Sequence, residues 1–519
     1  MHADAVKRAG RCKAGDFGAE IRVRQGGRGG KMKNRKLLLC EKCNKHDASQ
    51  PHNAYLTVYL ALCLMVILSL FLTLIDGTRR NGARLEAEIV TDIGLQSIMA
   101  EYHRELMKQY NLFAIDASYG TALCTKANTE AHLMKYLKKN LNYEDVFLSN
   151  MLYRDFLGLR PEHAELKRIS LLTDGGGEVF RRCAVEAIKS DVGLDLLKEV
   201  QGWMETIEVN GLEEGKEEKQ KQEYDAQIEE IEDVEIDNPT DKLEQKKKRG
   251  ILKLVTENDA DLSQNVIYTD NLIMGRMQQG QVNRGNMAYD AQSDMERITE
   301  KFIFQEYLLQ YMGRYGGEQE EDALHYQIEY LIAGKNSDME NLQSVANRLC
   351  ALREAANAMY LLSDKTKRAE IKAAAELACL LALSPQLIPV VEGVILLAWA
   401  YAESIYDVKS LLAGGKVPLI KDENSWHYGL SAALEGDLQD ETKDGGGLAY
   451  KDYLRIFMML ADTDTITARA MNMVEADIRK TPGNAAFRLD GCYDAVEAYI
   501  RIGSSYGFQY EITRQKSYH

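Results

Sequence analysis

The residues best suited to bind a metal are two cysteines near the start of the chain. Cys40 and Cys43 are separated by two residues, which is the spacing of one half of a zinc ribbon. A structural zinc needs four ligands, and the nearest further candidates are His46 and His52. Only two residues separate Cys43 from His46, so the loop between the ligand pairs is compressed. Chance spacing is the simpler interpretation, and Cys40 and Cys43 remain the only metal candidates.

Other motifs that could do chemistry are incomplete. Glu101 and Glu105 flank His103, but on a helix the two carboxylates share a face while the imidazole points elsewhere, so we interpret them as a solvated face. The glycines at 175–177 and 413–416, like those at 445–447, lack the spacing and the Lys-Ser/Thr ending of a phosphate loop and are interpreted as turns. His-Glu-x-x-His does not occur, and GSSYG (503–507), which has the letters of Gly-x-Ser-x-Gly, is interpreted as a turn between two strands. We therefore predict no catalytic residue, no cofactor and no enzyme activity.

The clearest structural element in the sequence is one long apolar stretch. The run from Ala54 to Ile75 has 22 residues and no charged side chain. At 1.5 Å per residue a helix of this length is about 33 Å long, enough to span a hydrocarbon core of about 30 Å. We predict a transmembrane helix over 54–75 that places the chain in the lipid bilayer. Its predicted anchor residues are Ala54, Tyr59, Leu64, Leu70 and Ile75.

The charges on either side of the span predict its orientation. Residues 1–53 carry thirteen Lys and Arg against five Asp and Glu, whereas the whole chain has a net charge of −15. The larger basic cluster stays in the cytoplasm, so we expect a single-pass protein of the cytoplasmic membrane. Residues 1–53 would be a basic cytoplasmic tail, and the bulk of the chain would be extracytoplasmic. The acidic exterior argues against binding nucleic acid and against binding anionic lipid headgroups, and no small-molecule ligand is predicted.

Two features concern processing near the N-terminus. The sequence LIDGTRRNG at the end of the span lacks a small-x-small cleavage site, and a prepilin-type glycine and glutamate are absent. We therefore expect an uncleaved signal anchor. Met32 begins MKNRKLLL, a second candidate start, and we hypothesise that residues 1–31 are an over-extended start. N-terminal sequencing of the expressed protein tests this hypothesis.

The pattern of apolar residues predicts a mainly α fold with a small β component (α+β). Prolines number only seven, and long stretches show a period of 3.6 residues, which is typical of helices. Leu85, Ile89 and Ile93 recur at roughly helical spacing after the span. We therefore expect the transmembrane helix to continue as an amphipathic stalk, with Gly77 and Gly82 favouring a kink.

A charge-dense tract at 213–250 divides the remainder of the chain. It has almost no apolar stripe, so we interpret it as a charged helical arm or linker between segments 76–212 and 251–519. Strands are expected at 111–116 and 266–270, and helices at 129–140, 178–205, 300–315, 320–333, 338–362, 366–383 and 387–413. The last two helices are too short to cross a membrane and are interpreted as a buried hairpin. Residues 491–502 and 508–514 alternate in polarity and predict a C-terminal β-hairpin.

Several segments together carry a resemblance to a known group of proteins. They are TVYLAL (57–62), IDGTRRNGARLEA (75–87), AEYHRELMKQYNLFAIDASYG (100–120), QIEYLIAGK (327–335), AWAYAES (398–404), LLAGGKVPL (411–419) and SSYGFQYEITR (504–514). The chain resembles a membrane-anchored family of Gram-positive bacteria. In layout it is similar to the TadE/TadG-like minor pseudopilins of tight-adherence (Flp) pilus loci. The resemblance covers about residues 54–519 and implies no catalytic residues.

The expected function follows from this layout. The resemblance implies a membrane-anchored structural or assembly component of a Tad/Flp-type pilus or a related secretion system. Its partners would be other pilus-assembly or pseudopilin-like membrane proteins. Two alternatives stay open, an anchored enzyme that acts on the cell wall and an anchored surface sensor. Paired carboxylates in a cleft would favour the enzyme, and a tail that is not needed for function would oppose the sensor.

Overall fold

The computed structural model describes residues 53–121, 123–141, 157–212, 250–256, 262–287, 294–317, 322–381, 385–436 and 446–518. The chain divides into two compact units, Met1–Thr73 and Leu74–His519. In the first unit the described residues form the beginning of helix α1 (Asn53–Met99). The second unit holds a small antiparallel sheet and a larger set of helices. The expected α+β class, with helix predominating, is confirmed.

The sheet is built around one central strand. Strand β5 (Cys492–Ser504) pairs with β2 (Leu159–Leu171) along one edge. On the other edge it pairs with β6 (Gln509–Ser517) and with β1 (Ile115–Asp116). All of these pairs are antiparallel. Strands β5 and β6 form the predicted C-terminal hairpin, which is confirmed.

The part of α1 that belongs to the second unit packs on this sheet. One hydrophobic core joins α1 to α3 (Lys126–Leu141), β2, β5 and β6. The side of α1 that enters this core carries mostly small residues, Ala83, Ala87, Val90, Gly94, Leu95 and Ile98. Small side chains let the helix backbone approach its neighbours closely: a Cβ added at Gly94 would lie 3.0 Å from a Leu137 methyl group.

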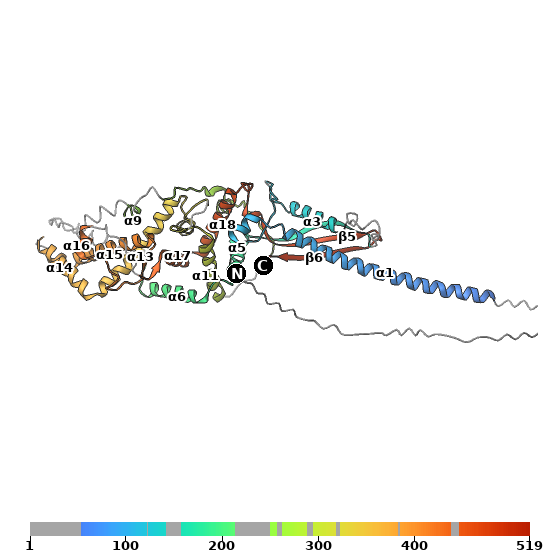
Figure 1. Cartoon of the computed structure of the whole chain (residues 1–519), viewed down its shortest axis with the longest axis horizontal. Helices are drawn as coiled ribbons and strands as arrows, with labels where there is room; N and C mark the ends of the chain where they lie inside the picture. The colour runs from blue at the N-terminus through green and yellow to red at the C-terminus, as the bar shows by residue number, and fades with distance from the viewer. Residues whose placement is uncertain are drawn as a thin grey trace, which may run out of the picture. The chain divides into compact units, whose positions relative to one another are not determined.

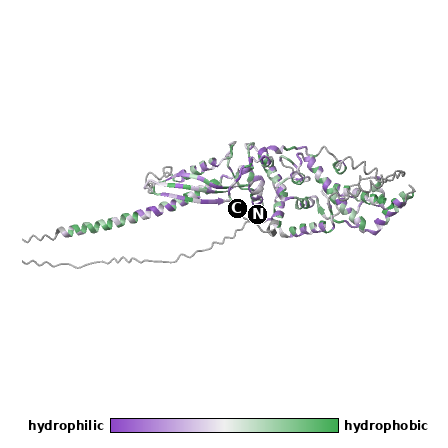
Figure 2. Ribbon diagram, turned by 180° about the vertical axis from the view of Figure 1, so that it is seen from behind, coloured by the Kyte–Doolittle hydropathy of each residue, from purple (hydrophilic) through white to green (hydrophobic). Residues whose placement is uncertain are grey.

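The apolar residues that were predicted to form the stripe of the stalk are therefore exposed, not buried. Leu85, Ile89 and Ile93 are 60 %, 48 % and 40 % exposed, whereas the alanine-rich face between them is buried. At Gly77 and Gly82, where a kink was expected, α1 continues as one helix from Asn53 to Met99. Figure 2 shows the change along α1 from a hydrophobic beginning to a mixed surface.

The stalk helix ends earlier than the pattern of apolar residues suggests. After Met99 the chain leaves the helix, and a separate helix, α2 (Arg104–Tyr110), follows. The His103 side chain caps α2 by accepting a hydrogen bond from the Leu106 N–H at 3.2 Å. Leu106 and Tyr110 are buried in a second core.

That second core is formed by helices from the rest of the chain. They are α5 (Asp174–Ile188), α6 (Leu194–Val209), α9 (Leu252–Val255), α10 (Ile273–Gln278), α11 (Asp294–Tyr311), α12 (Gln327–Ala333), α13 (Asp338–Ser363), α14 (Lys365–Leu381), α15 (Ile388–Leu412), α16 (Leu430–Glu435), α17 (Tyr450–Leu460) and α18 (Thr463–Lys480). Short 3₁₀ turns η3 (Thr269–Asn271), η4 (Pro385–Leu387) and η5 (Leu489–Gly491) and a two-stranded ladder, β3 (Lys416–Val417) with β4 (Leu448–Ala449), complete it. The most extensive helix pair is α13 with α15.

The predicted buried hairpin is confirmed for its second helix. The segment Pro385–Leu412 is long and apolar enough to cross a membrane, but 67 % of its most apolar window is buried inside the protein. Trp399 and Ala400 lie at its centre and are almost fully buried. Helix α14 packs against α15, although Leu377 and Leu380 on α14 remain exposed.

Two predicted strands need correction, and a third strand was not predicted. Of residues 111–116 only Ile115–Asp116 is a strand. At 266–270 the structure has a single bridge, Val266 to Ser337, followed by η3. Strand β2 was missed because its charged residues and Pro161 hide the alternation, and the ladder with β5 is what makes it a strand.

The proposed arm or linker at 213–250 lies outside the described residues except for Gly250.

Candidate functional site

The predicted metal candidates cannot be placed, because Cys40 and Cys43 lie outside the described residues. Across the described ranges no group of three or more His, Cys, Asp or Glu side chains is arranged to hold a metal ion. Cys63, Cys124, Cys183, Cys350, Cys379 and Cys492 are free thiols.

The predicted anchor residues lie on a helix with an uncovered surface. Tyr59, Leu64 and Leu70 are 67 %, 62 % and 66 % exposed, and Ile75 is 47 % exposed. Ala54 lies in α1 as well. None of the most apolar window of this helix is buried inside the protein. Its length, composition and exposure make α1 a candidate membrane span.

The acidic residues around the end of α1 have partners within the chain. Glu101 is not on a solvated helix face, because α1 has already ended. It pairs with His132 at 3.0 Å, and it accepts a hydrogen bond from the Tyr136 hydroxyl at 2.7 Å. Glu88 and Asp92 each lie 3.7 Å from the guanidinium of Arg514 on β6. These three acids therefore have their partners within the second unit.

A hollow among the described residues lies where β2 leads into α5. It has a volume of about 480 Å³, and its lining includes Asp174, Gly175, Gly176, Arg284 and Met287. Gly175, Gly176 and Gly177 have φ values of +65°, +71° and +97°, a left-handed conformation that favours glycine. The interpretation of this glycine run as a turn is confirmed.

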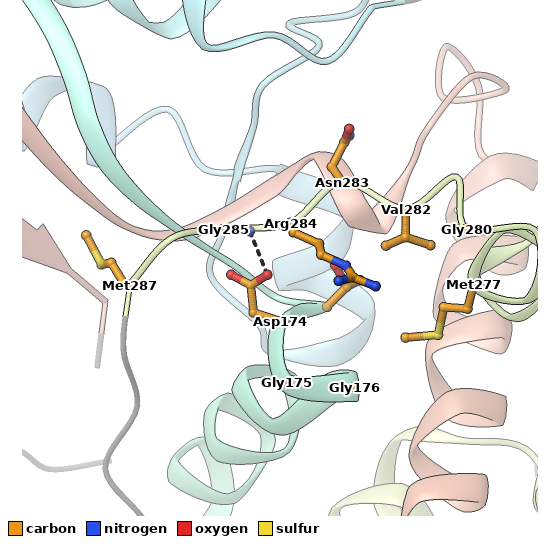
Figure 3. Close-up of a pocket in the computed structure, with 11 residues that line it drawn as sticks. Asp174, Gly175, Gly176, Met277, Gly280, Val282, Asn283, Arg284, Gly285 and Met287 are labelled. Carbon is orange, nitrogen blue, oxygen red and sulfur yellow. Dashed lines mark hydrogen bonds between the residues drawn. The ribbon is translucent and has the colours of Figure 1, made fainter.

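Asp174 joins the end of β2 to the segment that contains Gly285, and both border this hollow. Its carboxylate accepts hydrogen bonds from the Leu171 N–H at 2.8 Å and from the Gly285 N–H at 2.7 Å, and Figure 3 shows the second of these bonds. A Cβ at position 285 would lie 2.0 Å from an Asp174 oxygen, so only glycine fits there. Both oxygens of Asp174 are used in holding the loop.

The rest of the lining offers limited chemistry. Asp174 is the only acid in the described lining, whereas glycoside hydrolysis needs two carboxyl groups. Arg284 is exposed and makes no ion pair with a described residue, and the Asn283 side chain donates to the main-chain oxygen of Asp490 at 3.1 Å. Met277, Val282 and Met287 are apolar. The arrangement could bind a small group that carries negative charge, and it contains no acid–base pair.

A buried ionic cluster holds the outer wall of the hollow in place. Arg276 donates to Glu475 and to Asp490, each at 2.7 Å, and all three side chains are buried. Burial would raise the pKa of Asp490, but hydrogen bonds from Arg488 and the charge of Arg276 outweigh it and lower that pKa. These bonds fix α10 and the following segment against α18 and η5.

A second buried ionic cluster lies around α15. Arg353 on α13 donates to Asp407 at 3.0 Å. Lys421 lies 2.6 Å from Asp407 and also pairs with Glu403. All four side chains are buried. A smaller hollow of about 100 Å³ beside them is lined partly by Tyr406, Lys421, Trp426 and His427.

Two buried acids form no salt bridge with a described residue. Burial and the nearby charge of Asp322 raise the pKa of Asp477 to about 7, against the hydrogen bond from Tyr110. Burial likewise raises the pKa of Glu329 to about 7. Asp477 accepts hydrogen bonds from Tyr110 on α2 and, at 2.7 Å, from Gln327 on α12. It therefore joins the end of the stalk region to helices α12 and α18.

Sequence reasoning missed the hollow and all of these clusters. Asp174 stands directly before the glycine run, and a polar residue beside a turn of three glycines was the available signal. Arg276 and Asp490 are 214 residues apart, and no local pattern predicts that they meet.

Comparisons with known proteins give one match. Residues 229–504 match a family that is described as a family of unknown function, DUF5702. Comparison with the curated proteins and with the solved structures gave no match. Because the matched region covers more than half of the chain, the protein belongs to the DUF5702 family.

Proposed function

We propose that this protein is a membrane-anchored, extracytoplasmic structural or assembly component of a Tad/Flp-type pilus or a related secretion system. The observation that carries the proposal is the character of α1. Its first part is apolar and uncovered, and its later part is built into the core of the second unit. Such a helix can hold a folded unit at a membrane.

The composition of α1 supports the anchor. The helix has no charged side chain before Asp76, and its apolar residues from Tyr55 to Ile75 are largely exposed. In water this surface would be costly to expose, since each buried square ångström of apolar surface stabilises by about 25 cal/mol. A bilayer removes that cost, and the basic residues before the helix favour a cytoplasmic N-terminus.

A second feature of α1 supports assembly with other proteins. Leu85, Ile89 and Ile93 stand four residues apart and form an exposed apolar row on the part of α1 that lies beyond the span. Residues spaced by four lie on one face of a helix, so the row offers a surface to a neighbouring helix. Pseudopilin-like subunits, which the chain resembles, are expected to associate through such helices.

The first test is a pull-down from gently solubilised membranes. It compares the intact protein with a variant that lacks residues 54–75. We expect pilin, pilus ATPase or platform proteins to be recovered with the intact chain alone. If the intact chain brings down only wall fragments or nothing, the assembly role is wrong.

A substitution test separates assembly from anchoring. Replacing Leu85, Ile89 and Ile93 by serine should abolish recovery of the partners while the protein stays in the membrane fraction. The matched control is Leu123→Ser, which changes a leucine that is 70 % exposed on the loop before α3. Unchanged recovery with the triple variant would show that this row is not the docking surface.

A further inference from the structure

The turn of the C-terminal hairpin contacts the middle of α1, just after the apolar residues end at Ile75. The Cζ atom of Arg79 lies 4.0 Å from the ring centroid of Tyr506, and that of Arg80 lies 4.4 Å from the ring of Phe508. The Tyr510 hydroxyl donates to the Arg80 main-chain oxygen at 3.1 Å. We name these residues of the second unit, Arg79, Arg80, Tyr506, Phe508 and Tyr510, the hairpin cluster.

Strand β6 then follows α1 away from the span. Four residues after Tyr510, Arg514 faces Glu88 and Asp92, each at 3.7 Å. Four residues further on, the Tyr518 hydroxyl donates to the Met99 main-chain oxygen. The contacts thus advance in the same order along both elements, as the course of β5 and β6 beside α1 in Figure 1 also shows. The order of contacts places the hairpin turn nearest to Ile75 and the end of β6 farthest from it.

The position of the hairpin cluster matches the depth of a headgroup layer. Arg79 comes four residues after Ile75 in the same helix, which is a rise of about 6 Å. A bilayer of about 40–45 Å with a hydrocarbon core of about 30 Å leaves roughly 5–8 Å of headgroup region on each side. If the apolar span ends at Ile75, both arginines lie within that region.

The chemistry of the hairpin cluster fits the same place. Tyrosine is enriched at membrane interfaces, where its ring lies at the level of the headgroups, and arginine binds phosphate through several N–H donors. Asp76 pairs with Arg80 at 2.9 Å. Tyr506 is 44 % exposed although its ring contacts Arg79.

We infer that the hairpin turn docks on the outer leaflet, with Arg79 and Tyr506 among the lipid headgroups. The occupant of this surface is the phosphate-bearing headgroup layer of the bilayer that holds α1, so the inference rests on the proposed membrane anchor. The hairpin then acts as a second contact with the membrane beside the helix. It limits how far the second unit can tilt, because the turn and α1 are tied through Arg79, Arg80 and Tyr510.

Tryptophan depth measurements test the inference. The full chain is placed in phosphatidylcholine–phosphatidylglycerol nanodiscs that contain lipid spin-labelled either on the headgroup or in the middle of the acyl chain. Tyr506→Trp reports on the turn, and Leu64→Trp reports on the span. Gln515→Trp is the matched control, since it is exposed on β6 seven residues beyond Phe508, a distance of about 23 Å. The wild type supplies the emission of the three native tryptophans.

The outcomes separate the turn from the anchor. We expect headgroup label to quench the added emission of Tyr506→Trp, chain label to quench that of Leu64→Trp, and neither to quench that of Gln515→Trp. If Leu64→Trp is quenched but Tyr506→Trp behaves like Gln515→Trp, docking of the turn is wrong and the anchor stands. If Leu64→Trp is not quenched, the anchor itself is wrong, and the inference falls with it. Circular dichroism confirms that each variant is folded.

Discussion

Helices α1 and α15 are both long and apolar enough to cross a membrane, but they have opposite environments. The apolar window of α1 is uncovered, whereas 67 % of that of α15 is buried by protein. The apolar window of α1 is also the more hydrophobic of the two. The helices differ as well in the polar residues that each carries and in the groups that the rest of the chain supplies to meet them.

Helix α15 carries acids that are satisfied inside the protein. Glu403 and Asp407 are fully buried and pair with Lys421, and Asp407 also accepts from Arg353. A bare carboxylate would be costly in hydrocarbon, and these partners come from α13 and from the segment after α15. The apolar part of α1 has no charged residue to satisfy. Buried ion pairs along a hydrophobic helix therefore mark it as part of a protein core.

The largest expected effect comes from emptying the core around α15. Trp399 is 1 % exposed, and its indole N–H donates to the Tyr428 main-chain oxygen at 2.8 Å. Trp399→Ala should lower the free energy of unfolding by about 3–5 kcal/mol. Leu64→Ala, on the uncovered part of α1, should change it by no more than about 0.5 kcal/mol. Urea unfolding in detergent, followed by circular dichroism, measures both.

The two results together test the contrast between the helices. Equal losses of stability would mean that the start of α1 is packed against protein, and the assignment of its surface to lipid would be wrong. A negligible loss from Trp399→Ala would mean that α15 does not lie in the core.

A smaller effect should appear as a dependence of stability on pH. Asp477 and Glu329 have pKa values of about 7 in the folded chain, against ordinary values of 3.8 and 4.5. Each therefore binds its proton more tightly when folded, so its stabilising contribution is complete below its ordinary pKa and is lost as the pH rises through about 7. Raising the pH from 6 to 8 should cost about 1.4 kcal/mol for each group.

Glu329→Gln isolates one of the two groups. One oxygen of Glu329 accepts from the Tyr450 hydroxyl at 2.8 Å and from the Tyr315 N–H at 3.0 Å, and an amide oxygen can do the same. The other oxygen has no hydrogen-bond partner, so an NH₂ group can replace a protonated oxygen there. The variant should lose about half of the pH dependence between 6 and 8 in urea unfolding. An unchanged slope would show that Glu329 does not titrate in this range.

The sequence predicted structural elements correctly where their contacts are local or where their composition is extreme. The span, helices α13 and α15 and the C-terminal hairpin follow from periodicity, alternation and turn residues close together in the chain. Strand β2 did not, because its charged positions face outward and its partner β5 lies more than 300 residues away. The buried face of α1 was assigned wrongly since large apolar residues were assumed to point inward, whereas Ala83, Ala87 and Gly94 allow the closer approach.

Most of the candidate site could not be predicted from the sequence. The hollow at Asp174 needs Gly285 from a distant segment, and the cluster that supports it joins Arg276 to Glu475 and Asp490. Such pairs arise from tertiary packing and leave no spacing signal. The glycine run at 175–177 was noticed, and its interpretation as a turn was confirmed because three successive residues adopt positive φ.

The smallest predicted effect compares two glycines along α1 itself. A Cβ added at Gly77 meets nothing within 4 Å, whereas one added at Gly94 would lie 3.0 Å and 3.3 Å from methyl groups of Leu137 and Leu133. Alanine is favoured over glycine inside a helix by about 1 kcal/mol, so Gly77→Ala should stabilise α1 by about that amount. Gly94→Ala gains the same helix preference but must displace the leucines of α3, and overpacking costs about 1–3 kcal/mol. Urea unfolding of both variants in detergent should therefore rank Gly77→Ala above the wild type and Gly94→Ala at or below it. The reverse ranking would mean that α1 packs loosely against α3 at Gly94 and that protein covers α1 already near Gly77. The two ends of α1 would then differ less in burial.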